Sequence, residues 1–141
     1  MTVIHDIRVT QSATDQCEDI ALYVDHKEIG HAILNWVPKY ALYKTCDIPE
    51  IQDVHINQDH RKKGYATALI NFCEDRVRDK GKENIGISVP VVKDFAPAQC
   101  LYISLGYKPD GYGVTYDRQT VGFGDIRPVD DNLCLMMIKR L

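Results

Sequence analysis

The sequence predicts a mixed α/β domain in which an antiparallel β-meander precedes a β-α-β unit. Two observations predict this class. Apolar and polar residues alternate along much of the first part of the chain, as they do in strands. Across residues 65–79 the apolar residues instead recur every three or four positions, as in an amphipathic helix, and a buried strand follows. A chain of 141 residues can bury one core but not two, so residues 1–141 are expected to form a single domain.

The first strands are predicted by their apolar alternation. A strand beginning at Ile4 precedes a polar segment, 10–18, that could hold at most one helical turn. Two β-rich runs near 19–25 and 28–37 read as a hairpin. A looser stretch bracketed by two prolines follows. Residues 51–56 then form a strand whose alternation slips by one position, as a β-bulge would cause.

The centre of the chain carries the clearest helix. Its apolar stripe runs from Tyr65 to about Asp79, and Gly81 is placed to end it. The short apolar run 84–89 follows as a buried strand. One helix between this strand and 51–56 has the length of a crossover connection, so the two strands are expected to pair in parallel.

A second helix of about ten residues is indicated by Pro97 near its first turn and Gly106 at its end. Strands are expected at 112–116 and 133–141, with a long irregular connection between them. The prediction is thus a mixed, mostly antiparallel sheet of about six or seven strands with two main helices.

Composition excludes several classes of protein. The net charge is −3, whereas a nucleic-acid-binding domain is expected to be basic. No apolar run approaches the ~18 residues of a membrane helix, and the start of the chain does not resemble a signal peptide. Five cysteines without CxxC spacing argue against a zinc site and a disulfide framework. We expect a cytoplasmic protein with reduced thiols, no metal, and no nucleic-acid or membrane partner.

Residues 60–69, HRKKGYATAL, place three basic side chains before a glycine at the start of the central helix. Three interpretations compete: a solvated helix start, a patch for nucleic acid, or a cradle for a phosphorylated cofactor. The last has a physical basis, because a helix start carries unpaired N–H groups and a partial positive charge that together hold a pyrophosphate. Glycine and alanine keep side chains out of its way.

These residues, with their neighbours, resemble the GNAT superfamily of N-acetyltransferases over nearly the whole chain. RKKGYA at 61–66 matches the superfamily's [RQ]xxGx[GA] signature, APAQCLYISLGY at 96–107 is similar to its AxxLYxxLGF segment, and LCLMMIKRL resembles its closing strand. The resemblance implies acetyl-CoA bound at a splayed strand pair. It implies these cofactor-binding residues: Ile56, Arg61, Lys62, Lys63, Gly64, Tyr65 and Ala66.

Acetyl transfer to an amine needs a base for the amine and an acid for the departing thiolate. The resemblance makes Tyr102 the candidate acid, because it occupies the tyrosine of the LYxxLG segment. Glu50 lies eleven residues before Arg61, where histone-type members carry a glutamate base. Asp53 and His55 are the alternatives, and we expect them to share one face of the strand and to lead a proton out through water.

The acceptor is expected to be a primary amine of a small molecule or peptide. Aspartates and aromatic residues in the connection 117–132 would suit a cationic amine. Two alternatives remain open: a catalytically weak module that binds acetyl-CoA as a sensor, and a solvated loop with no acceptor role. A homodimer formed through edge strands is plausible.

Overall fold

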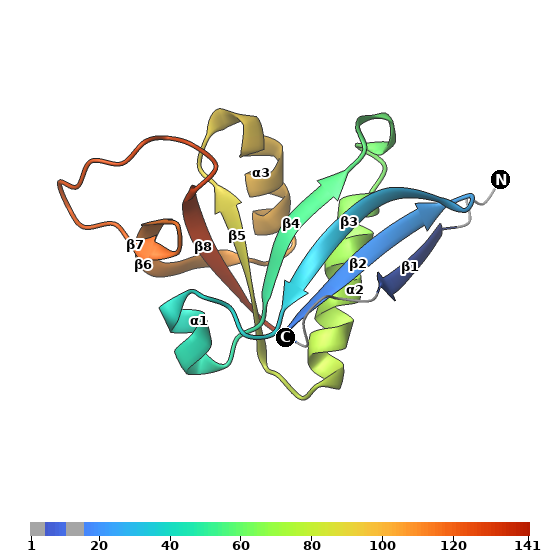
Figure 1. Ribbon diagram of the computed structural model, residues 1–141, viewed down its shortest axis with the longest axis horizontal. Coiled ribbons are helices and arrows are strands. Elements are labelled where there is room, and N and C mark those ends of the chain that lie inside the picture. The colour runs from blue at the N-terminus through green and yellow to red at the C-terminus, as the bar shows by residue number, and fades with distance from the viewer. Residues whose placement is uncertain (1–4, 11–15) are drawn as a thin grey trace.

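The computed structural model describes residues 5–10 and 16–141, which form a single eight-stranded sheet with three α-helices. The strand order is β1-β2-β3-β4-β5-β8-β6-β7. Figure 1 shows β1 to β4 in one half of the sheet and β5, β8, β6 and β7 in the other. The mixed, mostly antiparallel class predicted from the sequence is confirmed, with one strand more than the upper count expected.

The first half of the sheet is an antiparallel meander. Its strands are β1 (His5–Thr10), β2 (Cys17–Val24), β3 (Lys27–Asn35) and β4 (Glu50–Ile56). Asp25 and His26 form the tight turn between β2 and β3, and both have positive φ, as a two-residue type I′ hairpin turn requires. The polar segment expected to hold at most one helical turn includes residues 11–15, which lie outside the described residues.

Helix α1 (Ala41–Cys46) occupies part of the stretch that the sequence predicted to be loose. Tyr40 and Tyr43 are almost completely buried there, in a small cluster with Cys134 and Met136 of the last strand. The helix ends at Asp47, which adopts the left-handed conformation. Six residues are too few for a helix to be stable by propensity alone, so tertiary packing of the tyrosines is what forms it.

The β-α-β unit matches the prediction closely. Helix α2 (Tyr65–Asp79) has the predicted bounds and leads into β5 (Asn84–Pro90). Strands β4 and β5 pair in parallel, but only Glu50 with Gly86 and Ile51 with Ile87 are partners. Beyond these two pairs the strands diverge, which confirms the splayed strand pair expected from the sequence (Figure 1).

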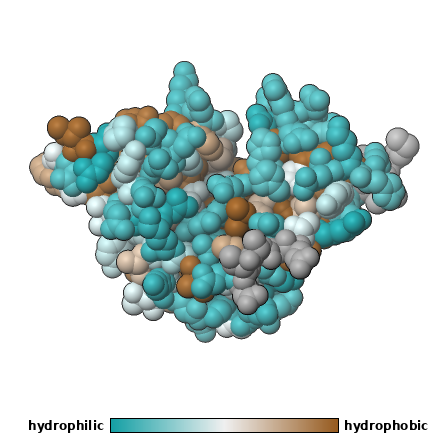
Figure 2. All heavy atoms as spheres, in the orientation of Figure 1, coloured by the Kyte–Doolittle hydropathy of each residue, from teal (hydrophilic) through white to brown (hydrophobic). Residues whose placement is uncertain are grey.

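The C-terminal half contains α3 (Ala96–Ser104), β6 (Lys108–Tyr116), β7 (Gln119–Thr120) and β8 (Leu133–Arg140). Strand β6 begins earlier than expected because its pairing with β8 is interrupted at 110–113 and resumes at Val114. Two single-turn 3₁₀ helices, Gln58–His60 and Lys93–Phe95, precede α2 and α3. The connection 121–132 projects from the body (Figure 1), and Figure 2 shows brown, apolar surface at that end; its exposed apolar residues are Phe123, Ile126 and Val129.

Two clusters of buried side chains lie on opposite faces of the sheet. Alternate residues of β5 separate them: Ile85, Ile87 and Val89 belong to the large cluster that includes α2, while Gly86 faces Tyr43 of α1. A Cβ at Gly86 would lie 2.4 Å from the Tyr43 ring, so glycine makes room for that helix. Within the described residues, no helix is long and apolar enough to cross a membrane.

Candidate active site

A cleft of about 770 Å³ opens where β4 and β5 diverge. Its walls come from the end of β4, the start of α2 and one side of α3. Figure 2 shows the surface notched at its upper edge between the two halves of the sheet. The lining residues are Val54, His55, Ile56, His60, Arg61, Lys62, Gly64, Tyr65, Ala66, Thr67, Asp94, Phe95, Pro97, Ala98, Leu101 and Tyr102. The cleft therefore contains most of the residues predicted to bind a cofactor, together with Tyr102.

The start of α2 is built to accept an anion. Gly64 is the residue before the helix and has φ +83, and no side chain caps the first turn. The first N–H groups of the helix consequently lack side-chain partners, and they belong to residues that line the cleft. An added Cβ at Gly64 would meet no protein atom within 4 Å. The positive φ favours glycine at this position, and the open space beside it is compatible with a pyrophosphate held by backbone amides.

The three basic residues of the signature lie in different places. Arg61 and Lys62 line the cleft, whereas Lys63 is exposed and does not. The Nε of Arg61 donates to the carbonyl of Ile56 at 2.9 Å, which joins the signature to the end of β4. Lys62 has φ +62, an uncommon value for a residue with a Cβ. Two basic side chains thus supply positive charge beside the start of α2, and neither of them caps the first turn of the helix.

Tyr102 reaches the cleft from α3. Its side chain is 6% exposed, and burial raises the pKa of its hydroxyl to about 12. The hydroxyl therefore keeps its proton throughout the neutral range. Pro97 in the first turn of α3 and Gly106 after its end fix the short helix that presents this residue.

A bulge in β4 determines which residues face the same way as Glu50. His31 pairs with His55, and Ile33 pairs with Gln52, so one residue of β3 lies opposite two of β4. His31, Ile33 and Asn35 share a face of β3. Their partners on β4, which are His55, Gln52 and Glu50, must therefore share a face of β4. The bulge predicted from the slip in alternation is confirmed.

His55 and Asp53 end up in different surroundings. His55 lines the cleft and lies beside His31, with the ring centroids 5.4 Å apart. Asp53 is exposed, does not line the cleft, and adopts φ +53 within the bulge. Because the bulge interrupts the alternation, the two-residue spacing does not by itself place the two side chains on one face.

Glu50 is completely buried at the point where β4 and β5 separate. It lies on the sheet face of α1, because its pairing partner Gly86 faces Tyr43. Its Oε2 accepts a hydrogen bond from the hydroxyl of Ser88 at 2.9 Å and one from Arg118 at 2.8 Å. Within the described chain, its Oε1 has no hydrogen-bond partner.

Arg118 is the residue that the sequence analysis did not single out. It reaches Glu50 from 68 residues away, out of the turn between β6 and β7. Burial lowers the pKa of its guanidinium, but the Glu50 carboxylate raises it, and the net shift is upward. The sequence carries one signal for this turn, which is the polar pair Asp117-Arg118 between β-branched and aromatic residues. It carries no signal for the contact between Arg118 and Glu50.

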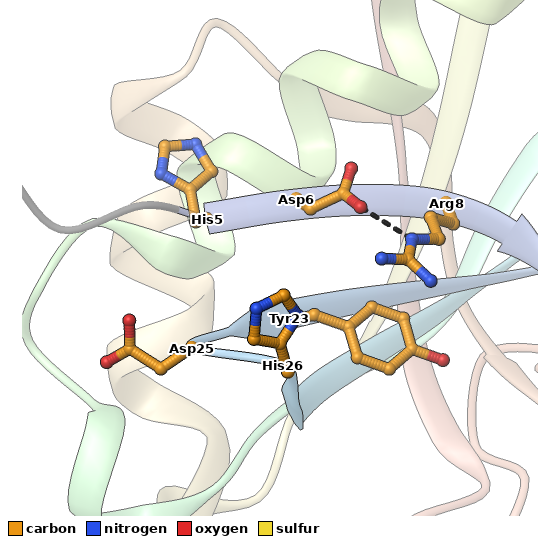
Figure 3. A pocket seen from close by; sticks show the side chains of 6 residues that line it. All are labelled: His5, Asp6, Arg8, Tyr23, Asp25 and His26. Carbon is orange, nitrogen blue, oxygen red and sulfur yellow. Dashed lines mark hydrogen bonds and ion pairs between the residues drawn. The ribbon is translucent and has the colours of Figure 1, made fainter.

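A second, smaller hollow of about 360 Å³ lies along the edge of the sheet. Figure 3 shows its lining side chains: His5, Asp6, Arg8, Tyr23, Asp25 and His26. Arg8 already forms an ion pair with Asp6 and lies over the Tyr23 ring, 4.8 Å from its centroid. The positive charge of Arg8 is thus paired within the hollow. The lining of the hollow includes neither the start of α2 nor Tyr102, which characterise the large cleft.

The five cysteines all lie among the described residues, and all are free thiols. Across residues 5–10 and 16–141, no group of three or more histidine, cysteine, aspartate or glutamate side chains is arranged to hold a metal ion.

The family of this chain follows from a family model. The model of the acetyltransferase (GNAT) family matches residues 5–107, which is most of the chain. The chain belongs to the GNAT acetyltransferase family. The comparison with curated proteins finds no match.

Solved structures share the fold at low sequence identity. A GNAT family acetyltransferase from Elizabethkingia anophelis, with acetyl-CoA bound, has a TM-score of 0.70 at 11% identity, over 97% of this chain and 98% of its own. The ribosomal-protein-S18-alanine N-acetyltransferase from Escherichia coli gives 0.71 at 13% identity, over 97% and 94%. Nourseothricin acetyltransferase gives 0.65 at 18% identity, over 89% of this chain and 66% of its own, just under two thirds of its length.

Proposed function

We propose that this protein transfers an acetyl group from acetyl-CoA to a primary amine by direct attack. The observation that carries the proposal is the placement of Tyr102 in the cleft and of Glu50 on the opposite face of the sheet, at one of the two strand pairings beyond which β4 and β5 diverge. A candidate acid and a candidate base therefore come from the two faces of the sheet. The family supports acetyl transfer in general, and the acceptor and the roles of the residues are our inference.

Acetyl-CoA fits the large cleft. The amides of Gly64, Tyr65 and Ala66 would hold the pyrophosphate, with Arg61 and Lys62 adding charge. Lys63 is exposed beside them and would meet phosphate groups that extend beyond the cleft. The backbone of Ile56 would meet the amide groups of the pantetheine arm. When bound, acetyl-CoA supplies the thioester whose C–S bond breaks as the acceptor nitrogen bonds to the acetyl carbon.

Glu50 is the proposed base. A free aliphatic amine is mostly protonated at neutral pH, so a proton must leave before or during attack. Glu50 Oε1 would take that proton, directly or through one water. His55 lies on the same face, as the bulge in β4 dictates, and would pass the proton toward solvent. Asp53, which is exposed two residues before His55 in the chain, is the alternative acceptor for that proton.

Tyr102 is the proposed donor to the departing sulfur. Its pKa of about 12 is well above the ~8.5 of a thiol, so complete transfer of its proton to the thiolate would be uphill. We infer that it acts mainly by donating a hydrogen bond to the sulfur as charge develops there. This role needs a protonated hydroxyl, which burial guarantees.

A cationic amine is the acceptor class that we infer. The aspartates of the 117–132 connection provide negative charge. Three of these aspartates have structural partners: Asp117 pairs with Lys39, Asp130 accepts from Tyr116, and Asp125 accepts from the amide of Gly122. Asp131 is exposed and is the one best placed to attract a positive ligand.

The test is release of free thiol from acetyl-CoA with a panel of amines. We expect turnover with polyamines, aminoglycosides or lysine peptides, weaker turnover with neutral arylamines, and a rate that falls as salt is added. Glu50→Gln should lower kcat/KM by about 10²- to 10⁴-fold. If calorimetry shows that acetyl-CoA binds but no amine is acetylated, the alternative of a binding module replaces the enzyme.

Two further expectations belong with this function. A homodimer formed through the edge strand β1 remains a proposal, to be checked by sedimentation. A cytoplasmic location also remains a proposal, and it is compatible with five free thiols.

A further inference from the structure

Arg118 contacts Glu50 from a two-residue hairpin turn. Asp117 and Arg118 form the two-residue turn between β6 and β7, with φ of +49 and +65. The turn directs the Arg118 side chain inward, where it is only 22% exposed. Its Nη2 bonds both Oε2 of Glu50, at 2.8 Å, and the hydroxyl oxygen of Ser88, at 3.1 Å. Side chains from β4, β5 and the β6–β7 turn therefore meet in one hydrogen-bonded triangle.

All the hydrogen bonds to Glu50 in this triangle use one oxygen. Ser88 and Arg118 both donate to Oε2, whereas Oε1 is buried and has no partner in the described chain. A buried carboxylate oxygen without a partner is costly, and such atoms in native structures call for an explanation. An acceptor amine, or a water held by it, is a donor that would satisfy this oxygen.

We propose that Arg118 is a positioning residue for the reaction: it binds Oε2 of Glu50 and thereby keeps Oε1 oriented and reserved for the acceptor. This inference rests on the role of Glu50 in the proposed function. Arg118 itself touches neither acceptor nor cofactor in this scheme. It acts only through the carboxylate that it holds.

The other charged and titratable groups around the triangle cannot replace Arg118. Tyr43 of α1 and Cys134 of β8 face Glu50, and burial raises the pKa of each. Both therefore stay neutral near pH 7. Asp53 of β4 contributes negative charge near Arg118. Without the guanidinium, Glu50 would be a buried carboxylate among neutral and negative groups, with no cation to balance its charge.

The experiment compares Arg118→Met, Arg118→Gln and Arg118→Lys in the full chain, with Arg140→Met at the end of β8 as the matched control. The pH dependence of kcat/KM is the main readout, with thermal unfolding recorded for each variant. We expect the acidic limb of the profile to move up by about one unit or more in the Met and Gln variants. The Lys variant should keep the wild-type limb, because it keeps the charge.

The possible outcomes distinguish the positioning role of Arg118 from the proposed role of Glu50 as the base. A limb that does not move in Arg118→Met or Arg118→Gln, while Glu50→Gln has lost activity, would show that Arg118 only supports the fold. Should the Met variant fail to fold, the Gln variant gives the same reading, because it keeps a donor and loses the charge. Full activity in Glu50→Gln would instead overturn the base role of Glu50 and leave Arg118 nothing to position.

Discussion

Tyr102 shows how one side chain can be buried and still face the cleft. Tyr102 is one of the residues that line the cleft, yet it is only 6% exposed and its ring lies 6.4 Å from that of Tyr107. Its raised pKa comes from burial alone, without a nearby charge. A donor of this kind is oriented by packing, so its direction does not depend on another titrating group.

Replacing Tyr102 with Phe should lower kcat by about 10²-fold, the usual cost of removing one donor to a developing negative charge. The fold should be retained, because the ring stays. The measurement is kcat under saturating acetyl-CoA. Tyr112→Phe, which removes a hydroxyl from an exposed tyrosine outside the cleft, is the control and should match the unmodified protein. An unchanged kcat in Tyr102→Phe would contradict the proposed role.

Backbone conformation at single residues also contributes to the site. Asp53 in the bulge and Lys62 in the signature both have left-handed φ, which costs a residue with a Cβ about 1 kcal/mol or more. Asp53 lies within β4, and Lys62 lies in the segment that joins β4 to the start of α2. The sheet and the helix on either side hold these residues in place.

At the scale of elements, a buried polar cluster ties α2 to the far half of the sheet. Glu74 is 3% exposed and accepts a hydrogen bond from the hydroxyl of Tyr107 at 2.9 Å. Lys139 of β8 contacts both of its carboxylate oxygens at 3.1 Å. Removing one partner from such a buried pair leaves the other charge unpaired, which is the costly case.

Glu74→Ala should therefore lower the free energy of unfolding by about 2–4 kcal/mol. Asp75→Ala is the matched control: it removes an exposed carboxylate paired with Arg78 from the next position, and should change stability by less than about 0.5 kcal/mol. Denaturant unfolding gives both values. Equal effects for the two variants would show that the Glu74 cluster adds nothing to stability.

The elements also show what the sequence could and could not predict. Helix α2 and strand β5 were predictable because each carries its own periodicity and end signals. Helix α1 was not, because it depends on Tyr40 and Tyr43 packing against residues about 90 positions later. The cofactor signature at 61–66 was predictable for the same reason as α2. An anion site at a helix start is formed by residues that are neighbours in the sequence, so a local pattern reveals it.

The contact between Arg118 and Glu50 is the part of the site that no local pattern could predict. It joins a turn to a strand 68 residues earlier, and it exists only once β8 has paired with both β5 and β6. The number of strands was underestimated for a similar reason. Strand β7 has only two residues and is recognisable only through its pairing with β6.

At the scale of the whole molecule, buried tyrosines make stability depend on pH in the alkaline range. Burial raises the pKa of Tyr102 to about 12 from the ordinary value of 10. Burial also raises the pKa of Tyr43 and Tyr107, with nearby carboxylates adding to the effect. The folded protein thus holds these protons at pH values where the unfolded chain has released them.

The contribution of these tyrosines to stability should accordingly be constant up to about pH 9 and then fall, by about 1.4 kcal/mol per pH unit for each such tyrosine, between the unfolded pKa and the folded one. The sign follows from linkage, because the unfolded state binds fewer protons in this range. Denaturant unfolding at several alkaline pH values gives the free energy, and the absorbance of tyrosinate reports ionisation. Tyrosinate forming well before unfolding would mean that these side chains are not buried as described.

The narrow joint between β4 and β5 has a consequence for how the sheet opens. The hydrogen-bonded ladder crosses from one half of the sheet to the other at only two residue pairs, Glu50 with Gly86 and Ile51 with Ile87. Transient separation of the halves therefore breaks few backbone bonds, and amide hydrogens near the joint exchange with solvent through that motion. A ligand that contacts both walls of the cleft opposes the separation, so acetyl-CoA should slow amide exchange in β4 and β5 together.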